Sequence, residues 1–123
     1  MNSVALVLNS HNINITEEVF NFNLGLTSLG YNLKTYKDEV PSFEKESYGI
    51  VFVDQLAFNC SGIEKAVEFS ENMNLKHSVI FLVVSKPLSK SEKNIVSQYR
   101  IKTITKPVLP ISLLRKFRGL ERL

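Results

Sequence analysis

Three short runs of consecutive apolar residues place the strongest constraint on the fold of this chain. Val4–Leu8, Ile50–Val53 and Val79–Val84 are each of strand length and contain no polar residue. A strand with one face in water alternates apolar and polar residues, so an unbroken apolar run predicts a strand buried on both faces. Both faces of such strands must be covered, which favours a parallel sheet with helices on either side.

Two shorter segments of mixed polarity, Leu33–Tyr36 and Ile101–Ile104, are expected to be strands nearer the edges of the same sheet. Between the first two strands, apolar residues spaced three and four apart predict a helix with one buried face, and a glycine ends it. These residues are Val19, Phe22, Leu26, Leu29 and Gly30. The connection after the second strand offers only a short, weak helix at Ser42–Ser47.

The remaining helices are marked by residues that favour helix N-termini. One helix is expected to start near residues 61–62, a capping box of Ser89 and Glu92 opens the next, and Pro110 suits the first position of the last. Buried strands that are each followed by a helix predict an α/β fold, a doubly wound five-stranded parallel sheet with helices on both faces. The 123 residues fit a single domain, 1–123.

Composition excludes several classes of protein. The longest apolar run, Val79–Val84, is far shorter than the roughly 20 residues of a membrane span, and Val4–Leu8 is too short for a secretory signal. A single cysteine, Cys60, excludes an intrachain disulfide and a cysteine-based metal cluster. We therefore expect a soluble, cytoplasmic domain without a membrane segment.

The net charge of +3 is a weak indication of a nucleic-acid partner. Nucleic-acid binders gather basic residues on one face, whereas the basic cluster here is terminal. It consists of Arg115, Lys116, Arg118 and Arg122. Because a helix dipole favours cations in the last turn, a solvated helix end is the better interpretation, and nucleic acid is not expected as a partner.

Polar residues follow the strands at the sheet edge where doubly wound proteins bind their ligands. Asp54 is the acid that directly ends an apolar strand, and Lys106 follows the last strand. A topology in which the first, third and fifth strands are neighbours would bring the two together. A carboxylate beside an ammonium can accept a phosphoryl group, or it can simply close the sheet as an ion pair. The two interpretations have about equal weight on spacing alone.

The chain also resembles the CheY-like receiver domains of two-component systems, which have a flavodoxin-like fold. The resemblance rests on the strand Tyr48–Asp54, the following loop Asn59–Ile63 and the Lys-Pro segment Ile104–Val108, and it spans nearly the whole chain. It implies that Asp54 is the candidate phospho-acceptor, and that Lys106 is the catalytic lysine. It further implies a cis peptide bond before Pro107.

The segment 105–114 is similar to receivers fused to hybrid sensor histidine kinases. The resemblance implies a role in phosphorelay signalling rather than an enzyme activity of this chain, with the kinase's catalytic domains lying elsewhere. The implied partners are a histidine kinase, a phosphotransfer domain, other signalling domains or a second copy of the chain. The domain would be a phosphoprotein if Asp54 is modified.

Two departures from the family pattern indicate a degenerate receiver. Where the family places an acidic pair after the first strand, this chain has Asn9 and Ser10. In receivers the pair, the acceptor aspartate and a backbone carbonyl, here that of Leu56, hold Mg²⁺. Mg²⁺ favours carboxylate oxygens, so its binding here is expected to be possible but weak. Phosphorylation that depends on the metal to neutralise the phosphoryl group should then be impaired.

The second departure concerns the phosphoryl switch. The family's hydroxyl at the end of the fourth strand is replaced by Val84, and Ser85 comes one residue late. Because strand side chains alternate faces, Ser85 can substitute only if the strand end is irregular. The family's aromatic residue on the fifth strand corresponds to Thr103, which is small.

Three functional hypotheses follow. The chain is a pseudo-receiver that acts through protein–protein contacts; or it is a working atypical receiver, phosphorylated on Asp54 with Ser85 and Asn9 as substitutes. The third is a flavodoxin-like small-ligand binder that holds phosphate at 9–12. That loop has no glycine, which disfavours the third hypothesis.

Overall fold

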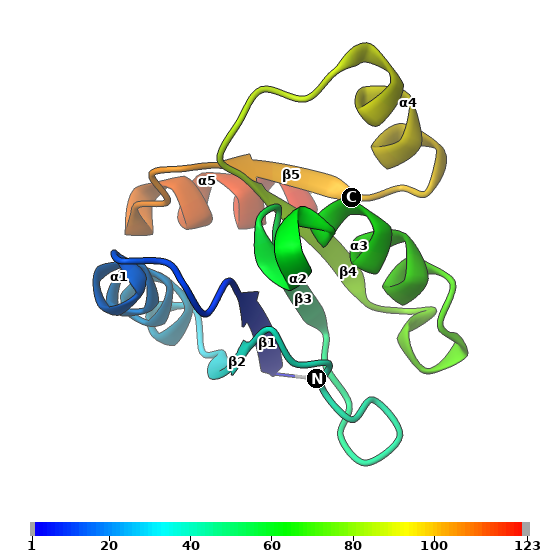
Figure 1. Cartoon of the computed structure of the whole chain (residues 1–123). Coiled ribbons are helices and arrows are strands. Elements are labelled where there is room, and N and C mark those ends of the chain that lie inside the picture. Colours follow the sequence, from blue (N-terminus) through cyan, green and yellow to red (C-terminus); the bar gives the residue numbers. More distant parts are fainter. Residues whose placement is uncertain (1, 122–123) are drawn as a thin grey trace.

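The chain forms a five-stranded parallel sheet in the order β2-β1-β3-β4-β5, which confirms the predicted doubly wound α/β fold (Figure 1). The structure is a computed structural model that describes residues 2–121, and the side chains of residues 2–118. The strands are β1 Ser3–Leu8, β2 Asn32–Lys37, β3 Ile50–Asp54, β4 Val79–Val84 and β5 Lys102–Thr105. The helices are α1 Ile15–Ser28, α2 Ala57–Cys60, α3 Gly62–Ser70, α4 Lys90–Gln98 and α5 Pro110–Glu121, and a 3-10 turn spans Met73–Leu75.

Each face of the sheet has its own hydrophobic core, because alternate residues of the buried strands point to opposite sides. In β1, Val4, Leu6 and Leu8 pack with α1 and α5 on one face. Ala5 and Val7 pack with α3 and α4 on the other face. The three apolar runs of the sequence are buried almost throughout, as expected for strands covered on both sides.

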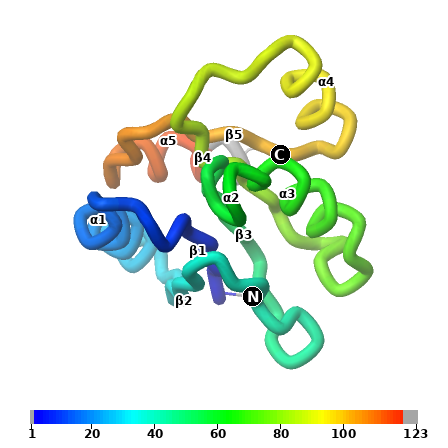
Figure 2. Tube along the Cα trace, in the orientation of Figure 1, coloured from blue at the N-terminus to red at the C-terminus, as the bar shows by residue number. Residues whose placement is uncertain are grey.

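Strand β2 and the connection after it differ from the prediction. No residue of β2 is fully buried, and no helix follows it; residues 38–49 form a loop instead (Figure 2). The segment 42–47 proposed as a weak helix makes only a single turn, in which the backbone N–H groups of Lys45 and Glu46 donate to the Ser42 carbonyl oxygen. Phe43 and Tyr48 of the loop are buried in the α3-side core, where the Phe43 ring lies 5.0 Å from that of Phe69. A few aromatic side chains thus cover the area that a helix would cover.

The strand neighbours also need a correction. β1 and β3 are adjacent as expected, but β4 lies between β3 and β5. A residue after β5 therefore reaches Asp54 only by extending across the end of β4.

The predicted helix starts agree with the structure. Gly62 begins α3, Pro110 begins α5, and the Ser89–Glu92 capping box closes the first turn of α4 with both of its hydrogen bonds formed. Arg115, Lys116 and Arg118 are exposed on α5, and Arg122 lies outside the described residues. Within residues 2–121, no helix is both long enough and apolar enough to cross a membrane.

Candidate functional site

Asp54 and Lys106 meet at the carboxyl edge of the sheet. The Lys106 Nζ lies 2.8 Å from the Asp54 Oδ2, although Asp54 ends β3 and Lys106 follows β5, which is not adjacent to β3. The Lys106 backbone N–H donates to the carbonyl oxygen of Val84, the last residue of β4. This hydrogen bond holds the Lys106 backbone beside the end of β4, and the side chain extends from there to Asp54. The Lys106–Pro107 peptide bond is cis.

The Asp54 carboxylate is fully buried, and both of its oxygens have partners. The Oδ1 accepts a hydrogen bond from the Leu56 backbone N–H at 2.8 Å, and the Oδ2 accepts from Lys106. The side chain of Asp54 is 1% exposed and that of Lys106 is 18% exposed. A buried carboxylate is tolerated only when it is paired and hydrogen-bonded, as here.

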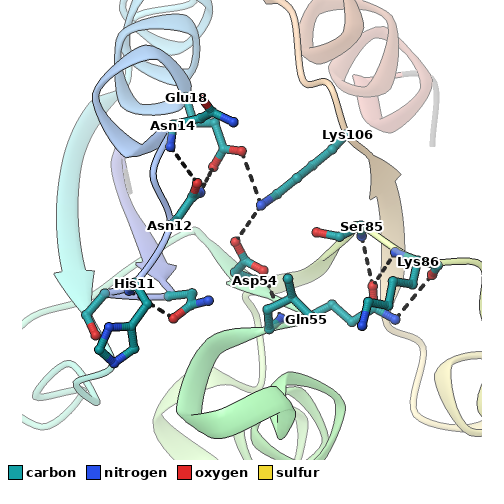
Figure 3. A network of polar contacts seen from close by, with 12 residues as sticks. His11, Asn12, Asn14, Glu18, Asp54, Gln55, Ser85, Lys86 and Lys106 are labelled. Atoms are coloured by element: carbon teal, nitrogen blue, oxygen red, sulfur yellow. Dashed lines mark hydrogen bonds and ion pairs between the residues drawn. The ribbon is translucent and has the colours of Figure 1, made fainter.

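Glu18 is a third member of this group that sequence reasoning missed. Its Oε1 lies 3.2 Å from the Lys106 Nζ, and its Oε2 accepts from the Asn12 side-chain amide at 2.6 Å (Figure 3). Burial lowers the pKa of Lys106, but the hydrogen bond to Asp54 and the charges of Asp54 and Glu18 outweigh it, so the pKa lies above its usual value. Acids are common in the first turn of any helix, so no sequence pattern distinguishes Glu18 from other such acids.

Asp38 is the second acid that was missed. It follows β2, and its Oδ2 accepts hydrogen bonds from the backbone N–H of Ser10, at 3.0 Å, and from the Ser10 hydroxyl. Its Oδ1 accepts from the Phe58 backbone N–H at 2.7 Å. One carboxylate thereby joins the loops after β1, β2 and β3. Its place after an exposed, mixed strand gave no reason to select it.

A left-handed turn follows Asp54. Phe58, Asn59 and Cys60 have φ values of 55°, 57° and 66°, a region in which non-glycine residues are strained by roughly 1–2 kcal/mol each. The turn brings the next helix back against the site so closely that a Cβ on Gly62 would lie 2.1 Å from the Asp54 carbonyl oxygen. Only glycine fits there.

Comparison with known proteins settles the fold. No family model matches the chain, and no curated protein matches its sequence. Among solved structures, the Vibrio cholerae chemotaxis response regulator CheY4 is 18% identical with a TM-score of 0.71, covering 97% of this chain and 98% of that one. A response regulator from Thermotoga maritima is 16% identical with a TM-score of 0.72 over 100% of both chains. The chain has the CheY-like receiver fold.

The BeF3-activated receiver domain of DrrB, whose full-length protein is from Thermotoga maritima, is also similar. It is 23% identical with a TM-score of 0.68, and the match covers 99% of each chain. Asn9 and Ser10, the positions proposed as metal ligands, follow β1 and are already hydrogen-bonded. The Asn9 Oδ1 accepts from the His11 backbone N–H at 3.1 Å, and Ser10 is bonded to Asp38. Within the part of the chain that the structure describes, no group of three or more His, Cys, Asp or Glu residues is placed to hold a metal ion.

The proposed switch positions lie on the other side of Asp54 in this receiver fold. Val84 is buried in the α3-side core, while Ser85 is exposed and its backbone N–H donates to the Gln55 Oε1 at 2.8 Å. Gln55 also accepts from the Lys86 backbone N–H, so it joins the loop after β3 to the loop after β4. Thr103 and Ser85 both line a cavity of about 570 Å³ beside α4.

Asp38→Asn is expected to destabilise the fold by about 1–2 kcal/mol, because it weakens charge-assisted hydrogen bonds to Ser10 and Phe58. Burial raises the pKa of Asp38, but the hydrogen bonds from Ser10 and Phe58 hold it below its ordinary value. This stabilisation is therefore complete above about pH 4 and is lost as the pH falls through the folded-state pKa. In urea unfolding, the difference in free energy of unfolding between the wild type and Asp38→Asn should be smaller at pH 3 than at pH 7. An equal difference at both pH values would contradict this role.

Proposed function

We propose that the chain is a pseudo-receiver of a two-component phosphorelay. It would bind Mg²⁺ weakly, would not be switched by Mg²⁺-dependent phosphorylation, and would act through contacts with other proteins. The observation that supports this most directly is the arrangement around Asp54. Its two oxygens already bond to Lys106 and Leu56, and Asn9 and Ser10 supply no carboxylate.

The donor set does not fit Mg²⁺ well. Mg²⁺ prefers several hard oxygens, above all carboxylates, in a near-octahedral arrangement. The Ser10 hydroxyl is bonded to Asp38, and the Asn9 amide oxygen is bonded within its own loop. Asp54 remains the single carboxylate among the positions proposed as ligands, so a divalent ion would have to break existing hydrogen bonds for little charge compensation.

The partners that we propose are a histidine kinase, a phosphotransfer domain, another signalling domain or a second copy of the chain, in the cytoplasm. The domain would have no enzyme activity of its own and would belong to a hybrid histidine kinase or act beside one. The receiver fold and the retained Asp54–Lys106 contact support a signalling role.

The retained contact also favours the second candidate, a working receiver phosphorylated on Asp54, with Ser85 and Asn9 as substitutes. If that candidate holds, a cognate kinase or phosphotransfer domain will label the wild type and fail to label Asp54→Asn.

The small-ligand hypothesis gains no support. The backbone N–H groups of Ser10, His11 and Asn12 already donate to Asp38 or Asn9, which leaves them unable to hold a phosphate without rearrangement.

Titration with beryllofluoride and Mg²⁺, followed by amide NMR, tests the pseudo-receiver proposal. The wild type is expected to show no saturable change at Asp54 and Leu56, and incubation with acetyl phosphate should add no phosphoryl mass. The DrrB receiver, whose BeF3-activated form is known, is the positive control. The double variant Asn9→Asp/Ser10→Asp restores the acidic pair and should gain at least tenfold in Mg²⁺ affinity. Stoichiometric modification of wild-type Asp54 would refute the proposal.

A further inference from the structure

The Lys106 ammonium lies between two carboxylates. Asp54 approaches from β3 and Glu18 approaches from the first turn of α1, so that the Nζ bridges the two sides of the site (Figure 3). The Lys106 and Glu18 side chains are 18% and 19% exposed, so this pair is largely removed from water. The Nζ lies 2.8 Å from the Asp54 Oδ2 and 3.2 Å from the Glu18 Oε1, so it forms an ion pair with both carboxylates.

Glu18 is held in this place by a chain of hydrogen bonds. The Asn14 backbone N–H donates to the Asn12 Oδ1 at 2.8 Å, and the Asn12 side-chain amide donates to the Glu18 Oε2 at 2.6 Å. The other carboxylate oxygen of Glu18 then faces Lys106. The neighbouring Glu17 is exposed, which makes it a natural comparison for Glu18.

The charges of this group oppose the entry of an anion. Asp54 and Glu18 together provide two negative charges against the single positive charge of Lys106. An external oxyanion that approached Asp54 would need Lys106 to offset its charge, and it would have to displace Glu18 to obtain that contact. In a site of low exposure, where charges are poorly screened, this competition is strong.

We propose that Glu18 is a specificity-determining residue: a built-in carboxylate partner of Lys106 that excludes external tetrahedral oxyanions of the phosphate class from the site beside Asp54. The proposal deepens the proposed function and rests on it, because it gives a second reason, independent of the metal ligands, why Asp54 would not be modified. Asn12 is the positioning residue that keeps Glu18 directed at Lys106.

Anion titration without metal tests this role. Orthophosphate, with chloride matched for ionic strength, is added to the wild type, Glu18→Gln and Glu17→Gln, and the amide signals of Leu56 and Lys106 are followed by NMR. Glu18→Gln should bind at least tenfold more tightly than the wild type. Glu17→Gln makes the same change of charge on the exposed neighbour and should match the wild type. Equal affinity of the two variants would overturn the proposal.

A second variant separates position from charge. Asn12→Ala keeps the carboxylate of Glu18 but removes its hydrogen-bond partner, so phosphate affinity should rise by a factor of about three to five, between the wild type and Glu18→Gln. If Asn12→Ala binds phosphate no more tightly than the wild type, the positioning role of Asn12 is refuted. The Asn12→Ala measurement tests the proposal even if Glu18→Gln folds poorly.

Failure of the Glu18 proposal can be distinguished from failure of the pseudo-receiver proposal. If the wild type stays unmodified with Mg²⁺ but Glu18→Gln gains no anion affinity, the Glu18 proposal alone is wrong. If the wild type binds beryllofluoride with Mg²⁺ and Glu18→Gln still binds phosphate more tightly without metal, the pseudo-receiver proposal alone is wrong.

Discussion

Replacing Lys106 by methionine should lower the free energy of unfolding by about 3 kcal/mol, since it leaves the buried Asp54 carboxylate without its counter-charge. Methionine keeps most of the volume and apolar stem of lysine, so lost packing contributes little. Urea unfolding at pH 7 measures the change. The double variant Asp54→Leu/Lys106→Met removes both charges and should recover much of the loss. Lys102→Met, at an exposed position of β5, is the control and should change stability by less than about 0.5 kcal/mol.

The difference in free energy of unfolding between the wild type and Lys106→Met should also depend on pH, which is a further check. Because the folded-state pKa of Lys106 is raised above its unfolded value, its stabilisation is complete below that unfolded value, near pH 10. The difference between the wild type and Lys106→Met should therefore be constant from pH 7 to about pH 9.5 and should shrink as the pH rises through the folded-state pKa. A loss below about 1 kcal/mol at pH 7 would show that Asp54 has enough compensation without the lysine.

Gly62→Ala should be at least as damaging as Lys106→Met, with a loss of about 3 kcal/mol or no stable fold. The added Cβ would lie 2.1 Å from the Asp54 carbonyl oxygen and 2.7 Å from the Gln55 Cα, and backbone atoms cannot move aside as a flexible side chain can. Thermal and urea unfolding measure the loss.

Gly30→Ala is the matched control for that substitution. Gly30 has a φ of +86° but open space around its Cβ position, so alanine there introduces backbone strain of about 1–2 kcal/mol without a clash. Equal losses at the two positions would mean that the close approach at Gly62 relaxes easily.

Much of the fold was accessible from the sequence, because burial on two faces leaves a clear trace. Val4–Leu8 and Ile80–Val84 have almost no exposed surface, and hydrophobicity alone selects such strands. The segment after β2 was harder, since Phe43 and Tyr48 replace a helix by packing single rings on the core. Single aromatic residues packed in this way do not recur at a regular spacing, so a periodicity search does not detect them.

Some residues of the candidate site could be predicted from the sequence and others could not. Asp54 was accessible because it ends an apolar strand, and Lys106 because it follows the last strand with a proline after it. Glu18 and Asp38 were not, because their roles depend on distances between segments far apart in the chain: Glu18 with Lys106, and Asp38 with Ser10 and Phe58. Exposed-looking acids in a helix turn or a loop are common, and spacing does not distinguish those that turn inward.

Strand β2 has a consequence for the motions of the molecule. It is an edge strand, paired only with β1, and the loop 38–49 that follows replaces a covering helix. Such segments open first in native-state fluctuations, at a cost well below that of global unfolding. Each time the end of β2 opens, Asp38 is withdrawn from Ser10 and Phe58, and the strained turn beside Asp54 loses its tether. We therefore expect amide exchange at Phe58 to follow transient fraying of β2, because the Phe58 N–H donates to Asp38, twenty residues away in the chain.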